Sequence, residues 1–169
     1  MRVAVDARIR ANHDLVGSLV RDGFGGVDAD GVEVRVEPAG RASRSFAGRA
    51  YSSVPKGARA APGVLYLVRL FVPVAPRDRG FPRTYRYRRL RSAPAITVGS
   101  WREALVALAA HEACHVRQFR DRLRRSEIDA ERWSKRVLAT WSAGDSEPPY
   151  VVIPMNQASR PVQLTLALP

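Results

Sequence analysis

One segment constrains the fold of this chain more than any other, the long stretch that follows Ser100. Ser100 and Glu103 have the spacing of a capping box, in which each side chain binds a backbone N–H group that the first helical turn leaves unpaired. Apolar side chains then recur every three or four positions, as at Leu105 and Leu108. The sequence therefore predicts a helix that begins at residue 101 and ends near residue 123.

A second helix is expected shortly afterwards. Ser126 and Asp129 repeat the capping pattern less strongly, so we place a break near residues 124–125 and a helix over residues 127–141. The face on which this helix is expected to pack is an apolar stripe at helical spacing, formed by Ala130, Trp133, Val137 and Trp141.

The first hundred residues are predicted to supply a sheet. The alternation over residues 32–36 is typical of a half-buried strand, and the run over 63–72 is strongly apolar. The other expected elements are a helical segment over 1–22, a strand over 44–53 with Gly48 at a bulge, partly irregular chain over 73–94 and a short strand over 96–98. The sequence thus predicts an α+β fold, in which a small, mostly antiparallel sheet packs on the helix over 101–123 and a further helix lies beside it.

Length and composition bound the class of protein. A chain of 169 residues suits one domain, which we place at residues 1–144, followed by a Pro-containing tail over 145–169. The single cysteine, Cys114, excludes an internal disulfide and fits a reducing compartment. The N-terminus has no apolar stretch of the signal-peptide type, and no run approaches the ~18 apolar residues of a membrane span. We therefore expect a soluble cytoplasmic protein.

The first of the two helices carries the motif His-Glu-Ala-Cys-His at residues 111–115. Side chains four positions apart on a helix project from one face, so the imidazoles of His111 and His115 can share one zinc ion. Glu112 stands beside the first imidazole, where it can act as general base toward water that zinc activates. A chance match on an amphipathic helix is the alternative, but the chain has only three histidines and two of them have this register. Since structural zinc sites use four protein ligands that usually include cysteines, we predict a catalytic site.

A catalytic zinc site needs a third protein ligand. His13 is the remaining histidine, but it lies far away in the N-terminal segment and is expected at the surface. Glu127 borders the apolar stripe of the second helix most closely and is our choice, while Asp129 and Glu131 stay open as alternatives. Glu131, one turn later, can instead orient a ligand through a hydrogen bond. Cys114 is a poor candidate, because small buried cysteines pack in the core.

The residues around the two histidines resemble known metallopeptidases. A His-Glu-x-x-His motif with a downstream Glu is similar to the gluzincin pattern, and an E-x-x-A-x-x-aromatic-small pattern typical of ImmA/IrrE-type metallopeptidases is matched by Glu127, Ala130, Trp133 and Ser134. In that family the Glu is the third zinc ligand, so the resemblance supports Glu127. Only eleven residues separate His115 from Glu127, which is short for the family, and no glycine among them can turn the chain.

The upstream layout resembles SprT-like metallopeptidases. In these a small sheet with a Gly-Arg-Ala-type strand precedes the motif helix, and the matching residues here are 48–51. A further strand leads into the motif helix, here residues 96–98. SprT-like enzymes use a third histidine, which this chain lacks near the motif. The resemblances imply hydrolysis of a peptide bond, in DNA-associated proteins for a SprT-like role or in a regulatory protein for an ImmA-like role. The candidates for stabilising the oxyanion are Tyr51, Tyr66, Tyr85 and Tyr87.

A net charge of +12 indicates attraction to polyanions such as DNA. Of the 28 basic residues 26 are arginine, however, a skew that is also typical of a GC-rich genome. One arginine run is interleaved with aromatic residues, as on single-strand-binding surfaces, and consists of Arg77, Arg79, Arg83, Arg86, Arg88, Arg89 and Arg91. A second basic run covers residues 117–125. The alternatives are a solvated loop for the first run, and for the whole chain a non-enzymatic basic nucleic-acid-binding protein with a structural or vestigial zinc site.

Residues 163–168 resemble the Q-x-x-L-x-L peptide by which bacterial proteins dock on the replication sliding clamp. The same residues alternate between apolar and other side chains, as a strand does. Because short motifs recur by chance, we favour the strand over the sliding clamp as the explanation.

Overall fold

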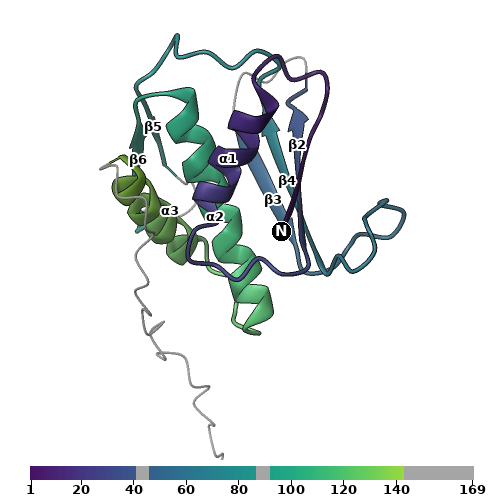
Figure 1. The fold of residues 1–169 in the computed structure, drawn as a ribbon. Helices are drawn as coiled ribbons and strands as arrows, with labels where there is room; N and C mark the ends of the chain where they lie inside the picture. The colour runs from purple at the N-terminus through teal and green to yellow at the C-terminus, as the bar shows by residue number, and fades with distance from the viewer. Residues whose placement is uncertain (41–45, 87–91, 143–169) are drawn as a thin grey trace, which may run out of the picture.

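The computed structural model describes residues 1–40, 46–86 and 92–142, which form the helices and strands drawn in Figure 1. In chain order the elements are β1 (Arg2–Val5), α1 (His13–Gly23), β2 (Val32–Pro38), β3 (Ala47–Tyr51), β4 (Tyr66–Val72), β5 (Arg83–Tyr85), β6 (Ile96–Val98), α2 (Trp101–Arg120) and α3 (Glu127–Ser142). The predicted mixture of helices and small sheets is therefore confirmed. The predicted tail over residues 145–169 lies outside the described residues.

The main sheet has the strand order β1-β2-β4-β3. β1 pairs with β2 and β2 with β4 in parallel, whereas β3 pairs with β4 in antiparallel orientation at the edge. The prediction of a mostly antiparallel sheet is therefore wrong for these four strands. The reason is the βαβ unit formed by β1, α1 and β2, because the crossover helix brings the chain back to run in the same direction. Only the separate β5–β6 hairpin is wholly antiparallel among the described strands.

The helical segment predicted over residues 1–22 is wrong in its first half, which contains β1. Helix α1 begins after Asn12, whose side chain accepts a hydrogen bond from the Leu15 N–H at 2.9 Å. Ile9 is buried in the loop before the helix and does not belong to the helical stripe. The spacing of Ile9 from Leu15 and Val16 is compatible with one face of a helix, although α1 begins only at His13.

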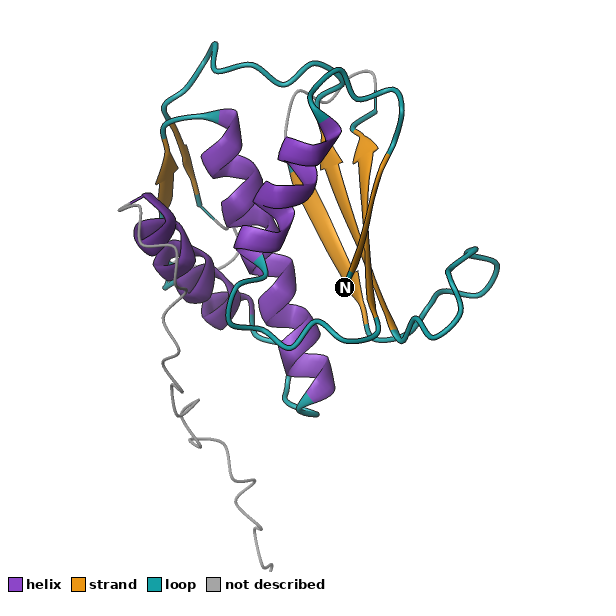
Figure 2. Ribbon diagram, viewed as in Figure 1, coloured by secondary structure: helices purple, strands orange, loops and turns teal. Residues whose placement is uncertain are grey.

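Helices α1 and α2 pack on one face of the main sheet, as Figure 2 shows. The buried side of the sheet is lined by Val34, Val36, Val68 and Leu70, which are inaccessible to solvent. α3 packs against α2 on the side away from the sheet, and β6 also contacts α2. α2 is thus surrounded by other elements, which explains why most of its residues are buried. None of the described helices is long and apolar enough to span a membrane.

The opposite face of the sheet carries charged side chains in ion pairs. Glu33 was expected on a half-exposed strand but is only 4 % exposed. Its carboxylate accepts hydrogen bonds from Arg35 at 2.7 Å and from the Ala61 N–H at 3.0 Å. On the same face Arg69 pairs with Glu37. The Glu33 carboxylate therefore ties the loop before β4 to the sheet.

The predicted cap of α2 is present, since the Ser100 hydroxyl accepts a hydrogen bond from the Glu103 N–H at 3.1 Å.

The turn between α2 and α3 is short and contains no glycine. The helix ends at Arg120, earlier than predicted, and Arg122 takes a left-handed conformation with φ of 54°. The Leu123 N–H then donates to the Gln118 carbonyl at 2.8 Å, as in a Schellman motif. Arg122 thus occupies a position that usually holds glycine.

Candidate metal centre

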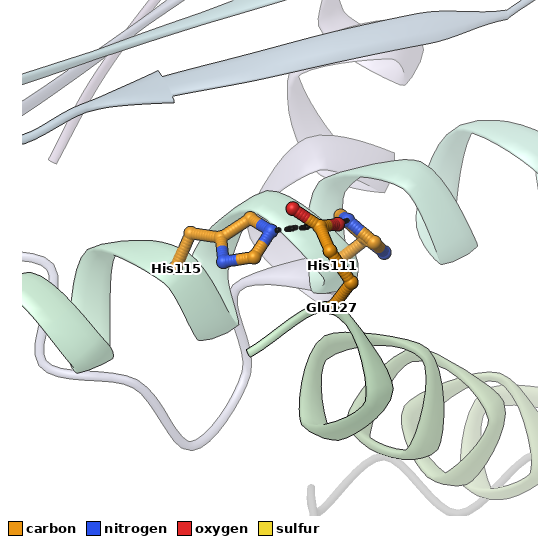
Figure 3. Close-up of side chains that lie close together, drawn as sticks. All are labelled: His111, His115 and Glu127. Atoms are coloured by element: carbon orange, nitrogen blue, oxygen red, sulfur yellow. Dashed lines mark hydrogen bonds and ion pairs between the residues drawn. The ribbon is translucent and has the colours of Figure 1, made fainter. Parts of the chain in front are cut away.

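Helices α2 and α3 bring three potential metal ligands to one point. Figure 3 shows His111 and His115 projecting from α2 toward Glu127, which lies at the start of α3. Glu127 Oε2 is 3.2 Å from His111 Nε2 and 3.4 Å from His115 Nε2, and the two nitrogens are 3.2 Å apart. This arrangement of two imidazole nitrogens and one carboxylate oxygen can hold a metal ion.

The local electrostatics favour the metal-binding forms of two of these groups. Burial lowers the pKa of His115, although its hydrogen bond to Gln118 opposes that change. The hydrogen bond to His111 lowers the pKa of Glu127 to about 2 against the effect of burial. For His111, burial lowers the pKa, but the bond to Glu127 and the neighbouring carboxylates outweigh it and raise the pKa overall. At neutral pH Glu127 is therefore an anion and His115 is neutral, as metal coordination requires.

The other carboxylates named as alternatives lie outside this cluster. Glu131 Oε1 is 3.6 Å from His111 Nδ1, so it faces the ring nitrogen that points away from Glu127. Asp129 faces Arg132 at 3.9 Å, and its side chain is 40 % exposed. Of the three carboxylates left open by the sequence, the structure thus brings Glu127 to the cluster and Glu131 behind His111.

Two further residues considered as ligands also lie elsewhere. His13 begins α1, where its Nε2 contacts the Ile9 carbonyl at 3.1 Å. Cys114 is buried in the apolar core, and this burial raises the pKa of its thiol to about 12. Neither residue belongs to the cluster of three ligands, so the expectations for both agree with their positions.

Glu112 is buried beside the cluster, with an exposed fraction of 3 %. Its Oε2 has no hydrogen-bond partner among the described residues. Burial raises the pKa of Glu112 to about 7, although the His111 charge and the Ala50 N–H oppose this shift. A buried, partly unsatisfied carboxyl group is costly unless a ligand or a reaction uses it.

Gly48 permits the close approach of Glu112 to strand β3. The predicted bulge at Gly48 is wrong, because the pairing with β4 is continuous from Ala47 to Tyr51. A Cβ atom at position 48 would instead lie 2.5 Å from Glu112 Oε1. Glycine is therefore required by contact between the strand and the α2 side chain and not by an irregular strand.

A cavity of about 470 Å³ opens beside these groups. His111, Glu112 and Glu127 lie on its wall, together with Arg49 and Arg125. Glu131 and Ser134 of α3 also lie on the wall. Its apolar residues come from the segment before β3, the β5–β6 hairpin and the first half of α2, and are Phe46, Ile96, Val98, Ala104, Ala107 and Leu108. Arg125 also pairs with Glu127 Oε1 at 2.9 Å. The cavity thus combines a charged end at the ligands with an apolar end.

Tyr85 is the tyrosine that lines this cavity within the described chain. Its hydroxyl is buried and has no hydrogen-bond partner there. Tyr51 instead contacts Arg69, and Tyr66 lies beneath the Arg120 guanidinium, 5.4 Å from the ring centre. Tyr87 lies outside the described residues.

Gln118 is a site residue that the sequence reasoning missed. Its Oε1 is 2.9 Å from His115 Nδ1, and the side chain is fully buried. The available signal was its position one turn after His115 on the same helix, where side chains meet. A glutamine at such a position is also common on helix surfaces, so burial was needed to identify it.

The predicted arginine surface is only partly described. Arg77, Arg79 and Arg86 are exposed, whereas Arg83 donates to the Gly80 carbonyl at 2.8 Å and lies over the Phe81 ring. Arg88, Arg89 and Arg91 lie outside the described residues, as do residues 163–168. In the second basic run, Arg117 and Arg120 make ion pairs with Asp121 and Asp28.

Comparisons of the chain with models of protein families, with curated proteins and with solved structures find no match.

Proposed function

We propose that this chain is a zinc-dependent metallopeptidase, with His111, His115 and Glu127 as zinc ligands and Glu112 as general base. The observation that carries this proposal is the convergence of the three ligands beside a buried carboxyl group with an unpartnered oxygen. His111, Glu112 and Glu127 also line one cavity that offers room for a substrate. A structural metal site would need neither the buried Glu112 carboxyl group nor the cavity.

The spacing of the donor atoms supports zinc as the metal. Zinc binds these atom types at about 2.0–2.2 Å, so two ligands on a tetrahedral ion lie about 3.3–3.5 Å apart. The three donor atoms are separated by 3.2, 3.2 and 3.4 Å. Two histidines and one glutamate are also the ligands of known catalytic zinc sites, which keep the fourth position for water or substrate.

A zinc ion held by His111, His115 and Glu127 would polarise the substrate carbonyl and lower the pKa of the attacking water. Glu112 takes a proton from the attacking water and delivers it to the amine that leaves. Tyr85 lines the same cavity and its hydroxyl has no partner among the described residues, so we propose it as the donor of a hydrogen bond to the oxyanion.

Strand β3 and the cavity suggest how a peptide is held. β3 is the edge strand next to β4, and Gly48 of this strand touches Glu112. An extended peptide can add to such an edge through main-chain hydrogen bonds. The apolar end of the cavity then accommodates one uncharged side chain of the substrate, while its charged end places the scissile bond at the ligands.

Zinc content tests this proposal first. We expect about one zinc per chain in purified, untagged protein. His111→Ala and Glu127→Ala should abolish stable binding, whereas Asp129→Asn, which alters the neighbouring exposed carboxylate, should retain the metal. A wild-type protein that takes up no zinc after reconstitution would exclude the enzyme and leave a basic binding protein as the better account. Retention in Glu127→Ala would exclude Glu127 as the ligand.

The charge favours substrates that lie on DNA, as in the SprT-like role. The net charge is +12, and Arg77, Arg79 and Arg86 are exposed. Cleavage of a DNA-binding protein should then accelerate when single-stranded DNA is added at low salt. Equal rates with and without DNA would favour the ImmA-like role, in which a cytoplasmic regulatory protein is cut.

A further inference from the structure

We propose that Gln118 is a positioning residue that prepares His115 for the metal and holds the loop that carries Glu127. The inference rests on the proposed zinc site, and it assigns a role to a residue outside the ligand set. Gln118 is fully buried on α2, one turn beyond His115. Its side-chain amide makes three polar contacts, which together explain why a glutamine is needed.

The first two contacts determine the orientation of the amide. Gln118 Oε1 accepts a hydrogen bond from the Ser126 N–H at 3.2 Å, and Gln118 Nε2 donates to the Ser126 carbonyl at 3.2 Å. A backbone N–H can only donate and a backbone carbonyl can only accept. The reverse orientation of the amide would place donor against donor and acceptor against acceptor, so the orientation follows from the backbone of Ser126.

The third contact then determines the tautomer of His115. Gln118 Oε1 is 2.9 Å from His115 Nδ1, and an amide oxygen can only accept a hydrogen bond. The proton of the neutral ring must therefore be on Nδ1. The lone pair is left on Nε2, the atom that faces His111 and Glu127. Gln118 thus selects the form of the ring that can bind a metal at this place.

The same amide links the two helices at the ligand site. Ser126 immediately precedes Glu127, the first residue of α3. The Gln118 backbone also takes part, since its carbonyl accepts from the Leu123 N–H at 2.8 Å. Because one residue contacts His115 on α2 and both backbone groups of Ser126, it sets the separation of the second and third ligands. Arg122 takes the left-handed position of the turn that glycine usually occupies, and the contacts of Gln118 with Ser126 then fix the position of Glu127.

Two substitutions of Gln118 test the proposal. Gln118→Leu keeps a similar volume but removes all three contacts. Gln118→Glu keeps the two acceptor contacts, but in place of the donor it sets a carboxylate oxygen against the Ser126 carbonyl. Ser134→Ala is the control, because it removes another buried hydrogen bond between α3 and α2, that to the Ala107 carbonyl at 2.6 Å, without touching a ligand. All three variants are expected to lower the melting temperature, so stability alone does not distinguish them.

The deciding measurements are the His115 tautomer and the zinc affinity. In metal-free wild-type protein at pH 8, ¹⁵N NMR should show His115 protonated on Nδ1, and Gln118→Leu should lose this preference. The zinc dissociation constant should rise about 10- to 100-fold in Gln118→Leu. Gln118→Glu should recover most of the affinity and the Nδ1 proton, and Ser134→Ala should change neither.

An unchanged tautomer and an unchanged zinc affinity in folded Gln118→Leu would overturn the proposal. So would a loss in Ser134→Ala as large as that in Gln118→Leu, because the effect would then be one of general stability. If wild-type protein binds no zinc, the proposed function fails, but the tautomer measured in metal-free protein still decides the role of Gln118. If Gln118→Leu does not fold, a Gln118→Glu variant with Nδ1 deprotonated would overturn the proposal.

Discussion

Two glutamates of this protein expose almost equally little of their surface to solvent but have opposite surroundings. Glu33, on the charged face of the sheet, is 4 % exposed, and Glu112, on α2, is 3 % exposed. Glu33 accepts hydrogen bonds from Arg35 and the Ala61 N–H, which lower its pKa despite the opposing effect of burial. Glu112 keeps one oxygen unpartnered among the described residues, and burial raises its pKa to about 7.

The difference separates a structural carboxylate from one that is suited to chemistry. Removing a carboxylate from water costs free energy, which Glu33 recovers through its partners within the fold. Glu112 recovers only part of this cost, through the Ala50 N–H and the neighbouring charges, and Gly48 leaves the space that its carboxyl group needs. Uncompensated burial of an ionisable group beside a cavity is typical of functional sites. The following experiments therefore treat the two residues as a matched pair.

The largest effect is expected for Glu112→Gln, which removes the base and keeps the shape. Peptide hydrolysis should fall about 10²- to 10⁴-fold, the range for loss of a general base, while zinc content stays at the wild-type level. Activity assays on peptides with single apolar side chains, together with metal analysis, measure both quantities. Full activity in this variant would contradict the assigned role.

The stability of Glu112→Gln should move in the direction opposite to its activity. Because its folded pKa is raised, Glu112 destabilises the metal-free fold progressively as the pH rises from about 4.5 to about 7. Metal-free Glu112→Gln should therefore melt at a higher temperature than the wild type at pH 8, and the gap should close near pH 4. A variant that is less stable at pH 8 would show that the carboxylate is satisfied after all.

The next largest effect is expected for Gly48→Ala. The added Cβ would meet Glu112 Oε1 at 2.5 Å, so the carboxyl group must move. A displacement of about 1 Å at a catalytic group can cost about 100-fold in rate. Gly40→Ala is the control, because a Cβ there meets no atom of the described residues within 4 Å. Equal activity of the two variants would mean that the contact between β3 and Glu112 has no catalytic importance.

Glu33→Gln should change stability and leave the activity of each folded molecule intact. The loss of hydrogen bonds to a charged group should lower the free energy of unfolding by about 2 kcal/mol at pH 7. Since the folded pKa of Glu33 is lowered, its contribution is present above about pH 4.5 and is lost as the pH falls through the folded value. Denaturant unfolding at pH 7 and at pH 3 should show a larger loss at the higher pH. A lower rate of peptide hydrolysis in fully folded Glu33→Gln would contradict a purely structural role for Glu33.

The smallest effect concerns the turn between α2 and α3. Arg122 has a φ of 54°, a region that costs a side chain roughly 1 kcal/mol relative to glycine. Arg122→Gly should therefore raise the free energy of unfolding by up to about 1 kcal/mol. Arg124→Gly, outside that conformation, should give no gain in the same chemical denaturation assay. Equal changes in both variants would contradict the account of the turn.

Several elements could be predicted because their signals are local. The Ser100 cap, the apolar spacing of α2 and the stripe of α3 each depend on residues within a few positions of one another. The candidate ligands His111 and His115 follow from helical geometry alone, and Glu127 was chosen from the stripe and from resemblance. The start of α1 was missed because a buried loop residue, Ile9, continued the apolar pattern upstream.

The partners of these elements could not be predicted in the same way. Alternation in a strand indicates which side is buried but not which strand lies beside it, so β4 between β2 and β3, and the parallel pairing that results, were unexpected. The same limit applied to Gly48. Glycine is required there because of the Glu112 side chain, which comes from a distant part of the sequence.

The sequence by itself therefore determined helices α2 and α3, the Ser100 cap and the register of the two histidines, because each depends on short-range spacing along one chain segment. Only the tertiary structure decided which carboxylate joins them, which glutamate is left without a full set of partners, and that Gln118 touches both His115 and Ser126. These are contacts between different elements, and burial sets their energies. Burial depends on how the helices and the sheet pack, which local spacing does not encode.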